Sequence, residues 1–159
     1  MALTLLAPVS QSAQAAGTIS LTGTTYAQDF DSLASSGTSS SVPTGWDFYE
    51  TGTSPNTIYT AGTGSSNTGD TYSFGAASST ERAFGGLQSG GVNPTIGAQF
   101  TNNTGSAITG LQIAYTGEMW RAGVANRNAA ARLDFLYSTD APSLSSGTWT
   151  DVDTLDFQS

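Results

Sequence analysis

The chain of 159 residues has the size of one domain, and its twelve acidic residues against four arginines and no lysine give a net charge of -8. Such a chain is poorly suited to bind nucleic acid or anionic membrane surfaces, which require basic side chains. Cysteine and histidine are both absent, which excludes disulfides, catalysis by Ser-His-Asp or Cys-His groups, and thiolate or imidazole metal ligands, and leaves carboxylate-pair hydrolysis and oxygen-ligated calcium.

The N-terminus has the pattern of a partial signal peptide. An apolar run over residues 1–9 leads to Ala13-Gln14-Ala15, a small-x-small cleavage motif, and cleavage there would leave a mature domain over residues 17–159. The basic segment that normally precedes such a run is missing. We therefore expect a partial signal peptide over residues 1–16 and a secreted or cell-surface protein, the alternative being an Ala/Ser-rich terminus or a short helix. The run is much shorter than the ~20 residues of a membrane span, so no membrane insertion is expected.

Beyond residue 17, short segments rich in Thr, aromatic and β-branched residues alternate with clusters of Gly, Ser, Asn and Pro. The turn signals recur about every 8 to 12 residues, which is typical of a β-sandwich or barrel. Helical periodicity is weak, and its best patch is residues 127–131. In chain order we predict strands over residues 18–22, 26–33, 46–50, 57–60, 71–74, 82–87, 95–102, 108–120, 132–138 and 148–152.

Two of these segments alternate clearly between apolar and polar positions, as half-buried antiparallel strands do. The side chains expected to point inward from the two segments are Leu111, Ile113 and Tyr115, and Leu133, Phe135 and Tyr137. Residues 102–106 predict a hairpin turn that joins residues 97–101 to residues 107–111, because Asn and Gly tolerate positive φ. Residues 35–41 and 62–69 carry almost only small polar residues and are predicted to be exposed loops.

Several short phrases occur together in an order that is similar to a known family. They are Phe30-Asp31-Ser32-Leu33, Gly45-Trp46, Tyr72-Ser73-Phe74-Gly75, Ser79-Thr80-Glu81-Arg82-Ala83-Phe84-Gly85, Tyr115-Thr116-Gly117-Glu118-Met119-Trp120-Arg121 and Gly147-Thr148-Trp149-Thr150. Over residues 18–157 the chain resembles an N-terminal β-sandwich domain of bacterial exported proteins, many of which end in a PEP-CTERM sorting signal.

The resemblance implies an all-β, antiparallel two-sheet sandwich of the jelly-roll kind. Related domains lie beside extracellular nuclease, phosphatase or autotransporter regions, and most have no assigned role. The family domain continues for several more strands, so the resemblance also implies that the C-terminal strands are missing from residues 17–159.

The segment around Trp120 is the main candidate for ligand contact. Glu118 and Arg121 flank Trp120, and an arginine fork could bind the carboxylate in two parallel hydrogen bonds. The same group could bind a sugar, with Trp120 stacked on its apolar face. A buried Trp beside a structural ion pair is the alternative.

Glu81 and Arg82 form a second acid-base pair and are further candidates for ligand contact, beside Glu118, Trp120 and Arg121. Neighbours in a strand point to opposite faces, so these two are not expected to bind each other; Glu81 could instead pair with Arg121, or Arg82 with Glu118, across the sheets. Glu81 and Glu118 are also the pair that a glycosidase would use, although no motif distinguishes them from other acids.

Calcium is the only metal that the composition favours. Asp70, after Asn67-Thr68-Gly69, and the pair Asp151 and Asp153 offer oxygen ligands in turn-like settings, although neither segment matches an EF-hand loop. Solvated turn residues are the alternative. Asp29 and Asp31 are expected on the wet side of their strand.

Aromatic residues outside these segments could form an exposed platform or fill the space between sheets. They are Trp46, Trp149, Tyr49, Tyr59 and Tyr72.

The sequence as a whole predicts a non-catalytic accessory or structural domain of a bacterial exported protein, in contact with extracellular polysaccharide and without a cofactor other than a structural calcium ion. The alternatives are a carbohydrate-binding module with a defined glycan, which requires two exposed coplanar rings, and an accessory domain of a secreted hydrolase or nuclease.

Overall fold

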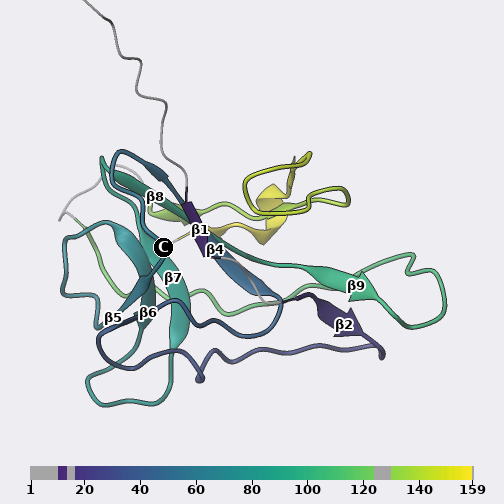
Figure 1. The fold of residues 1–159 in the computed structure, drawn as a ribbon, viewed down its shortest axis with the longest axis horizontal. Helices are drawn as coiled ribbons and strands as arrows, with labels where there is room; N and C mark the ends of the chain where they lie inside the picture. Colours follow the sequence, from purple (N-terminus) through teal and green to yellow (C-terminus); the bar gives the residue numbers. More distant parts are fainter. Residues whose placement is uncertain (1–10, 14–16, 124–129, 159) are drawn as a thin grey trace, which may run out of the picture.

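A computed structural model describes residues 11–13, 17–123 and 130–158 of the chain. In these residues all regular structure is β, in thirteen short strands, apart from one 3-10 turn (Figure 1). The prediction of an all-β class is confirmed. The described part of the chain contains no helix with the length and apolar character needed to cross a bilayer.

Two sheets form the centre of the molecule. The first sheet contains β1 (Gln11–Ala13), β4 (Trp46–Gly52) and β8 (Val92–Ala98) in that order, and both pairs of strands are antiparallel. The register between β4 and β8 runs without a break from Trp46 opposite Ala98 to Gly52 opposite Val92. This long pair makes β4 and β8 the spine of the first sheet.

The second sheet has four strands in the order β3-β5-β6-β7. The strands are β3 (Thr38–Ser39), β5 (Tyr59–Gly62), β6 (Asp70–Phe74) and β7 (Ala83–Leu87). The pair β5-β6 is parallel, whereas β3-β5 and β6-β7 are antiparallel. The second sheet is therefore mixed, which differs from the purely antiparallel arrangement expected from the sequence.

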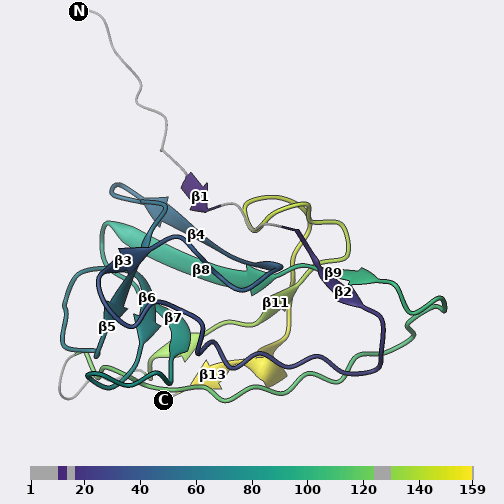
Figure 2. The same cartoon turned by 60° about the horizontal axis from the view of Figure 1, so that its bottom comes forward.

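The core lies between these two sheets, where β4 and β8 pass over the strands of the second sheet (Figure 2). Its centre is an aromatic cluster in which Phe48 of β4 meets Tyr59 of β5 and Phe84 of β7 with ring centroids 6.0 and 6.2 Å apart. Leu33 completes the buried set. Since side chains alternate along a strand and Phe84 lies opposite Ser73, Thr71 and Ser73 share this inner face, whereas Tyr72 and Phe74 face outward.

Three small two-stranded sheets lie outside this centre. The parallel pair β2 (Ile19–Leu21) and β9 (Phe100–Asn102) projects to the right in Figure 1. The other two pairs are antiparallel: β10 (Arg132–Leu133) with β13 (Phe157–Gln158), and β11 (Leu136–Tyr137) with β12 (Thr150–Asp151). The 3-10 turn η1 (Asp153–Leu155) joins β12 to β13.

The predicted strand over residues 26–33 is wrong. Phe30 has φ of 66°, which interrupts extended backbone, and the amide of Leu33 donates to the carbonyl of Phe30 at 2.9 Å as in a turn. This turn directs Phe30 and Leu33 toward the aromatic cluster. Conversely, β3 lies inside residues 35–41, which were predicted to be a loop. Part of the predicted helical patch, residues 127–129, lies outside the described residues, and residues 130–131 are not helical.

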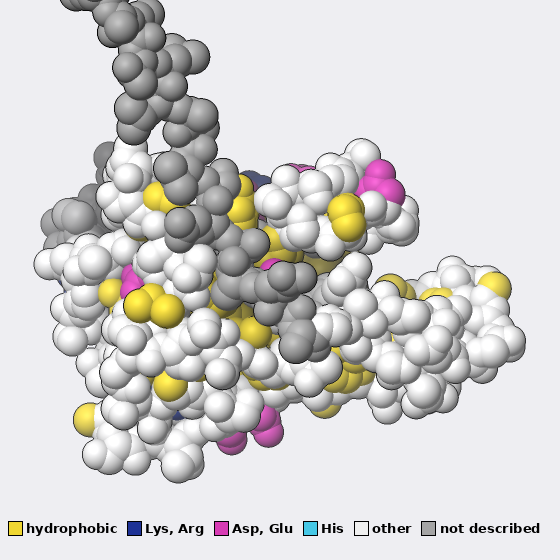
Figure 3. All heavy atoms as spheres, viewed as in Figure 1, with side chains coloured by type: hydrophobic (Ala, Val, Ile, Leu, Met, Phe, Trp, Pro, Cys, Tyr) yellow, Lys and Arg dark blue, Asp and Glu magenta, His cyan; other side chains and the backbone are white. Residues whose placement is uncertain are grey.

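The prediction that residues 108–120 and 132–138 form strands with inward-pointing apolar side chains is wrong. Residues 108–120 form no strand, and Leu111 is 72% exposed, with Ile113 and Tyr115 exposed as well. Leu133 and Tyr137 are also exposed, and Phe135 is only partly buried. Within the described residues no strand pairs with 108–120, so its alternating side chains have no sheet to cover. Hydrophobic side chains reach the surface at several places on the face drawn in Figure 3.

The predicted turn at residues 102–106 does form, although its second arm is not a strand. Asn102 accepts hydrogen bonds from the amide and hydroxyl of Thr104 at 3.1 and 2.7 Å, and its Nδ2 donates to the carbonyl of Ser106 at 2.8 Å. Gly105 has φ of 79°, the left-handed conformation that glycine tolerates. The sequence therefore predicted the turn correctly, but not the pairing of the strand that precedes it.

The exposure of Leu111 gives a direct test of this arrangement. We expect Leu111→Ala to change the free energy of unfolding by less than about 0.5 kcal/mol, because the side chain is already in water. A buried leucine in a strand would lose about 2 to 5 kcal/mol. Chemical denaturation followed by circular dichroism distinguishes the two values. A decrease in the free energy of unfolding of more than about 2 kcal/mol would mean that Leu111 is buried in the core after all.

Candidate functional site

Trp120 belongs to a ladder of three nearly parallel rings on the outer face of the second sheet. Tyr72 stacks on Phe74 at 4.9 Å and 19°, and Phe74 stacks on Trp120 at 6.2 Å and 6°. Tyr72 and Phe74 are buried, whereas Trp120 remains partly exposed. The ladder therefore ends in an indole ring that reaches the surface.

Polar contacts on both sides of Trp120 hold its segment in place. The indole Nε1 donates to Oε2 of Glu118 at 2.8 Å. Arg121 donates to the carbonyls of Gly64 and Ser65 at 3.1 and 3.2 Å, and also to the side chain of Asn67. The predicted Glu118–Arg121 fork is thus replaced by an indole–carboxylate bond and by a clamp of Arg121 on residues 64–67.

Arg82 lies on the opposite face of the second sheet. Its side chain, which follows the direction of Phe84, is buried at 2% exposure and donates to Oγ and to the carbonyl of Ser73. The amide of Arg82 donates to Oδ1 of Asp31 at 3.1 Å, which gives Asp31 a structural contact instead of the purely solvated role expected for it. Residues 82 and 120 therefore do not share a ligand surface, because the sheet separates their side chains.

The proposed cross-sheet ion pairs are not formed. All ion pairs within residues 11–13, 17–123 and 130–158 involve Arg132, so neither Glu81 with Arg121 nor Arg82 with Glu118 is paired. Glu81 is exposed, and its amide donates to Ser79 Oγ at 3.1 Å. The two acids nominated for hydrolysis have no hydrogen bond to each other or to a shared partner.

Two buried acids that the sequence did not single out as a pair connect the two sheets. Glu50 of β4 is completely buried; its Oε1 accepts from the amide and hydroxyl of Thr71 at 2.7 and 2.8 Å, and its Oε2 accepts from the amide and Nδ2 of Asn56 at 2.9 and 3.2 Å. Asp70 accepts from Asn56 Nδ2, the Thr71 amide and Thr60 Oγ1 at 3.2, 3.0 and 2.6 Å.

This Glu50–Asp70 network changes the interpretation of Asp70. Three internal donors already bind the carboxylate of Asp70, two on Oδ1 and one on Oδ2, and the residue is buried, which leaves little access for a metal ion and its waters. The arrangement favours a structural role over the predicted calcium ligand. The sequence did contain a sign of the buried carboxylate. Glu50 lies two residues after Phe48 in the same strand, so both side chains point to the inner face.

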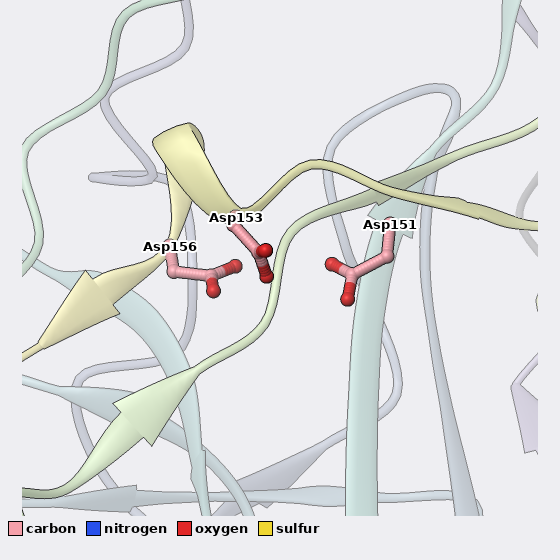
Figure 4. A group of neighbouring side chains, drawn as sticks. All are labelled: Asp151, Asp153 and Asp156. Carbon is pink, nitrogen blue, oxygen red and sulfur yellow. The ribbon is translucent and has the colours of Figure 1, made fainter.

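Asp151 and Asp153, by contrast, do come together, and the structure adds Asp156. Carboxylate oxygens of these three residues lie within 4.8 Å of one another around η1 (Figure 4). We call them the Asp triad. Arg132 reaches all three, with Nη2 at 4.0 Å from Asp151 Oδ2, 3.4 Å from Asp153 Oδ1 and 2.9 Å from Asp156 Oδ2, and it also binds Asp134.

Two groups beside the Asp triad, Arg132 and Tyr115, have raised pKa values. The hydrogen bond that Arg132 donates to the carboxylate of Asp134 is the main cause of the raised pKa of Arg132, and the negative charges of Asp134, Asp156 and Asp153 act in the same direction. Burial, and then the charge of Asp156, raise the pKa of Tyr115, whose hydroxyl donates to the carbonyl of Leu155. The direction at Arg132 is the one expected beside concentrated negative charge, whereas at Tyr115 burial is the larger cause and the charge of Asp156 adds to it.

The remaining aromatic residues do not form a platform. Tyr59 and Tyr72 are buried, Trp46 and Tyr49 are partly buried, and Trp149 is exposed with its Nε1 bonded to the carbonyl of Ser146 at 3.0 Å. The indole of Trp46 donates to Tyr26 at 2.8 Å and packs edge-on against Phe30.

No protein-family model matches the chain, and no curated protein or solved structure matches it.

Proposed function

We propose that the chain is a non-catalytic domain of a bacterial exported protein, with a jelly-roll-like sandwich architecture, that contacts extracellular polysaccharide through the surface around Trp120. The observation that supports this proposal is the position of Trp120 at the partly exposed end of the Tyr72–Phe74–Trp120 ladder. No other indole within the described residues ends such a parallel stack.

The geometry of Trp120 suits a sugar. Stacking on Phe74 fixes the plane of the indole, and the bond to Glu118 fixes its rotation, so little side-chain entropy remains to be lost on binding. The indole ring offers an apolar face to the C–H groups of a pyranose. Glu118 is exposed beside it and keeps oxygen lone pairs that can accept from sugar hydroxyls.

The environment of the acids favours binding over hydrolysis. A glycosidase needs two carboxyl groups in an accessible cleft. The closely connected pair here, Glu50 and Asp70, is buried: Glu50 of β4 accepts from Thr71 of β6, and Asp70 of β6 accepts from Thr60 of β5. Their roles are better explained by joining the sheets than by chemistry on a substrate.

The extracellular placement is supported by sequence features. The N-terminal pattern that ends at Ala13-Gln14-Ala15 resembles a signal peptide without its basic segment, and cleavage there would remove β1 and leave β4 as an edge of the first sheet. The net charge of -8 and the many Thr, Ser and Asn residues suit a domain that stays soluble outside the cell.

A pull-down with insoluble cellulose, chitin and xylan tests the proposal. We expect the chain to be retained on at least one of these polysaccharides, and Trp120→Ala to weaken retention at least about tenfold, as for a central aromatic contact. Trp149→Ala is the matched control, because Trp149 is exposed in a different loop. It should bind as the parent does.

The variant Trp120→Phe separates a binding role from a folding role. Phenylalanine can still stack on Phe74 but loses the bond to Glu118 and part of the ring area, so binding should fall less than with alanine while thermal stability is nearly retained. Absence of retention on all three polysaccharides, or equal retention of the parent and Trp120→Ala, would refute the proposed contact surface.

A further inference from the structure

We infer that the Asp triad is a calcium site in which the ion takes the place of the Arg132 guanidinium. The three residues are Asp151 at the end of β12, Asp153 in η1 and Asp156 just after η1. This inference concerns a different part of the molecule from Trp120 and goes beyond the proposed contact with polysaccharide.

The spacing of the three carboxylates matches a calcium ion. Calcium binds six to eight oxygens at about 2.3 to 2.6 Å, so two oxygens on opposite sides of the ion are about 4.6 to 5.2 Å apart. The triad offers one oxygen from each residue with all separations within 4.8 Å. Asp151 and Asp153 are exposed, which leaves room for the water molecules that complete such a coordination shell.

Asp156 supplies an independent indication of a ligand. Its side chain is 1% exposed, and Figure 4 shows its carboxylate turned toward Asp153. Oδ1 accepts from the amide of Phe135 at 2.9 Å, whereas Oδ2 is buried and receives no hydrogen bond. A buried carboxylate oxygen without a donor is costly, and a cation bound directly to it would remove that cost.

Arg132 marks the position of the ion. Within the described residues its Nη2 is the only cationic group that pairs with Asp156 Oδ2, at 2.9 Å, and it also lies 3.4 Å from Asp153 Oδ1 and 4.0 Å from Asp151 Oδ2. The contact to Oδ2 lacks hydrogen-bond geometry, so the guanidinium compensates the charge without satisfying the lone pair. A spherical ion has no such directional requirement.

The charge balance favours exchange over simple neutralisation by Arg132. Four carboxylates, those of Asp134 and the Asp triad, surround this one guanidinium, which leaves three negative charges in excess. The side chain of Arg132 is 43% exposed and already binds Asp134, so it can turn toward Asp134 and solvent when a divalent ion enters. Calcium would then hold β12 and η1 against Phe135 and stabilise the short pairs β10-β13 and β11-β12.

Thermal unfolding of the metal-free full chain, with calcium added at constant ionic strength, tests the inference. For a dissociation constant on the order of 1 mM, 10 mM calcium should raise Tm by about 3 to 5 °C in a saturable manner. Magnesium, which prefers to keep its waters, should raise Tm by less than about 1 °C. Asp156→Asn should abolish the calcium response. The matched control Asp29→Asn makes the same charge change at an exposed turn residue whose carboxylate accepts from the amide of Asp31, and it should retain the response.

Two further variants make the result decisive. Arg132→Gln removes the competing guanidinium and should lower the calcium concentration at half-response about tenfold; an unchanged or higher value would refute the exchange. If Asp156→Asn fails to fold, Asp153→Asn replaces it, since its side chain is 82% exposed, and it should weaken calcium binding about tenfold. Absence of a saturable calcium response, an equal response to magnesium, or a parent-like response in the Asp variants would overturn the site and would leave the polysaccharide proposal untouched.

Discussion

Replacing Glu50 by glutamine should lower the free energy of unfolding by about 3 kcal/mol. Each oxygen of Glu50 faces two donors, and glutamine would place its NH2 group against one of those two pairs in either orientation of the amide. Hydrogen bonds to a charged acceptor contribute about 1.5 to 3 kcal/mol each, so the loss of two outweighs the relief of repulsion from the nearby carboxylate of Asp70. Urea denaturation followed by tryptophan fluorescence measures the change.

Glu81→Gln is the control for this prediction, because it makes the same chemical change at an exposed position. It should alter the free energy of unfolding by less than about 0.5 kcal/mol. Equal effects of the two substitutions would mean that the Glu50–Asp70 network does not join the sheets as described.

We expect Phe84→Ala to cost about 3 to 5 kcal/mol. Phe84 is buried at the point where three rings meet it, with centroid distances of 5.6 Å to Phe30, 6.2 Å to Phe48 and 6.0 Å to Tyr59. Removing the ring loses its burial and leaves a cavity that the neighbouring strands cannot fill completely. Differential scanning calorimetry together with denaturant unfolding gives the loss.

Phe100→Ala provides the comparison, since Phe100 is about half exposed on β9 and meets a single ring, Tyr26, at 5.5 Å. It should cost no more than about 1.5 kcal/mol. A larger loss at Phe100 than at Phe84 would place the core of the protein near β2 and β9 instead of between the two main sheets.

The sequence was informative wherever structure depends on neighbours in the chain. The period-two pattern and turn residues located β4, β6, β7 and the Asn102 turn, because alternation and positive φ are local properties. The same pattern in residues 108–120 misled, since burial requires a partner strand and alternation alone does not provide one. Which strands pair in parallel, as β5 does with β6, is likewise set by the path of the chain.

The candidate sites show the same division. Asp151 and Asp153 are two residues apart, so their proximity was readable, and the Glu118–Trp120 bond spans an equally short distance. Arg132 is far along the chain from Asp153 and Asp156 and comes to them only through the pairing of β10 with β13. Arg82 illustrates the opposite error: adjacency to Glu81 suggested a surface role, whereas its strand position turns the side chain into the interior.

The order of the strands has a consequence for how the protein comes apart. Going from β3 to β8, the chain starts in the second sheet, crosses to the first for β4, returns for β5, β6 and β7, and crosses again for β8. Neither sheet is made of one continuous stretch of chain, so neither sheet can unfold as a separate unit. Because β4 is connected at both ends to strands of the second sheet, its loss from the first sheet also disturbs the second. The order in which the chain enters the two sheets therefore makes unfolding cooperative, independently of how well the interior is packed.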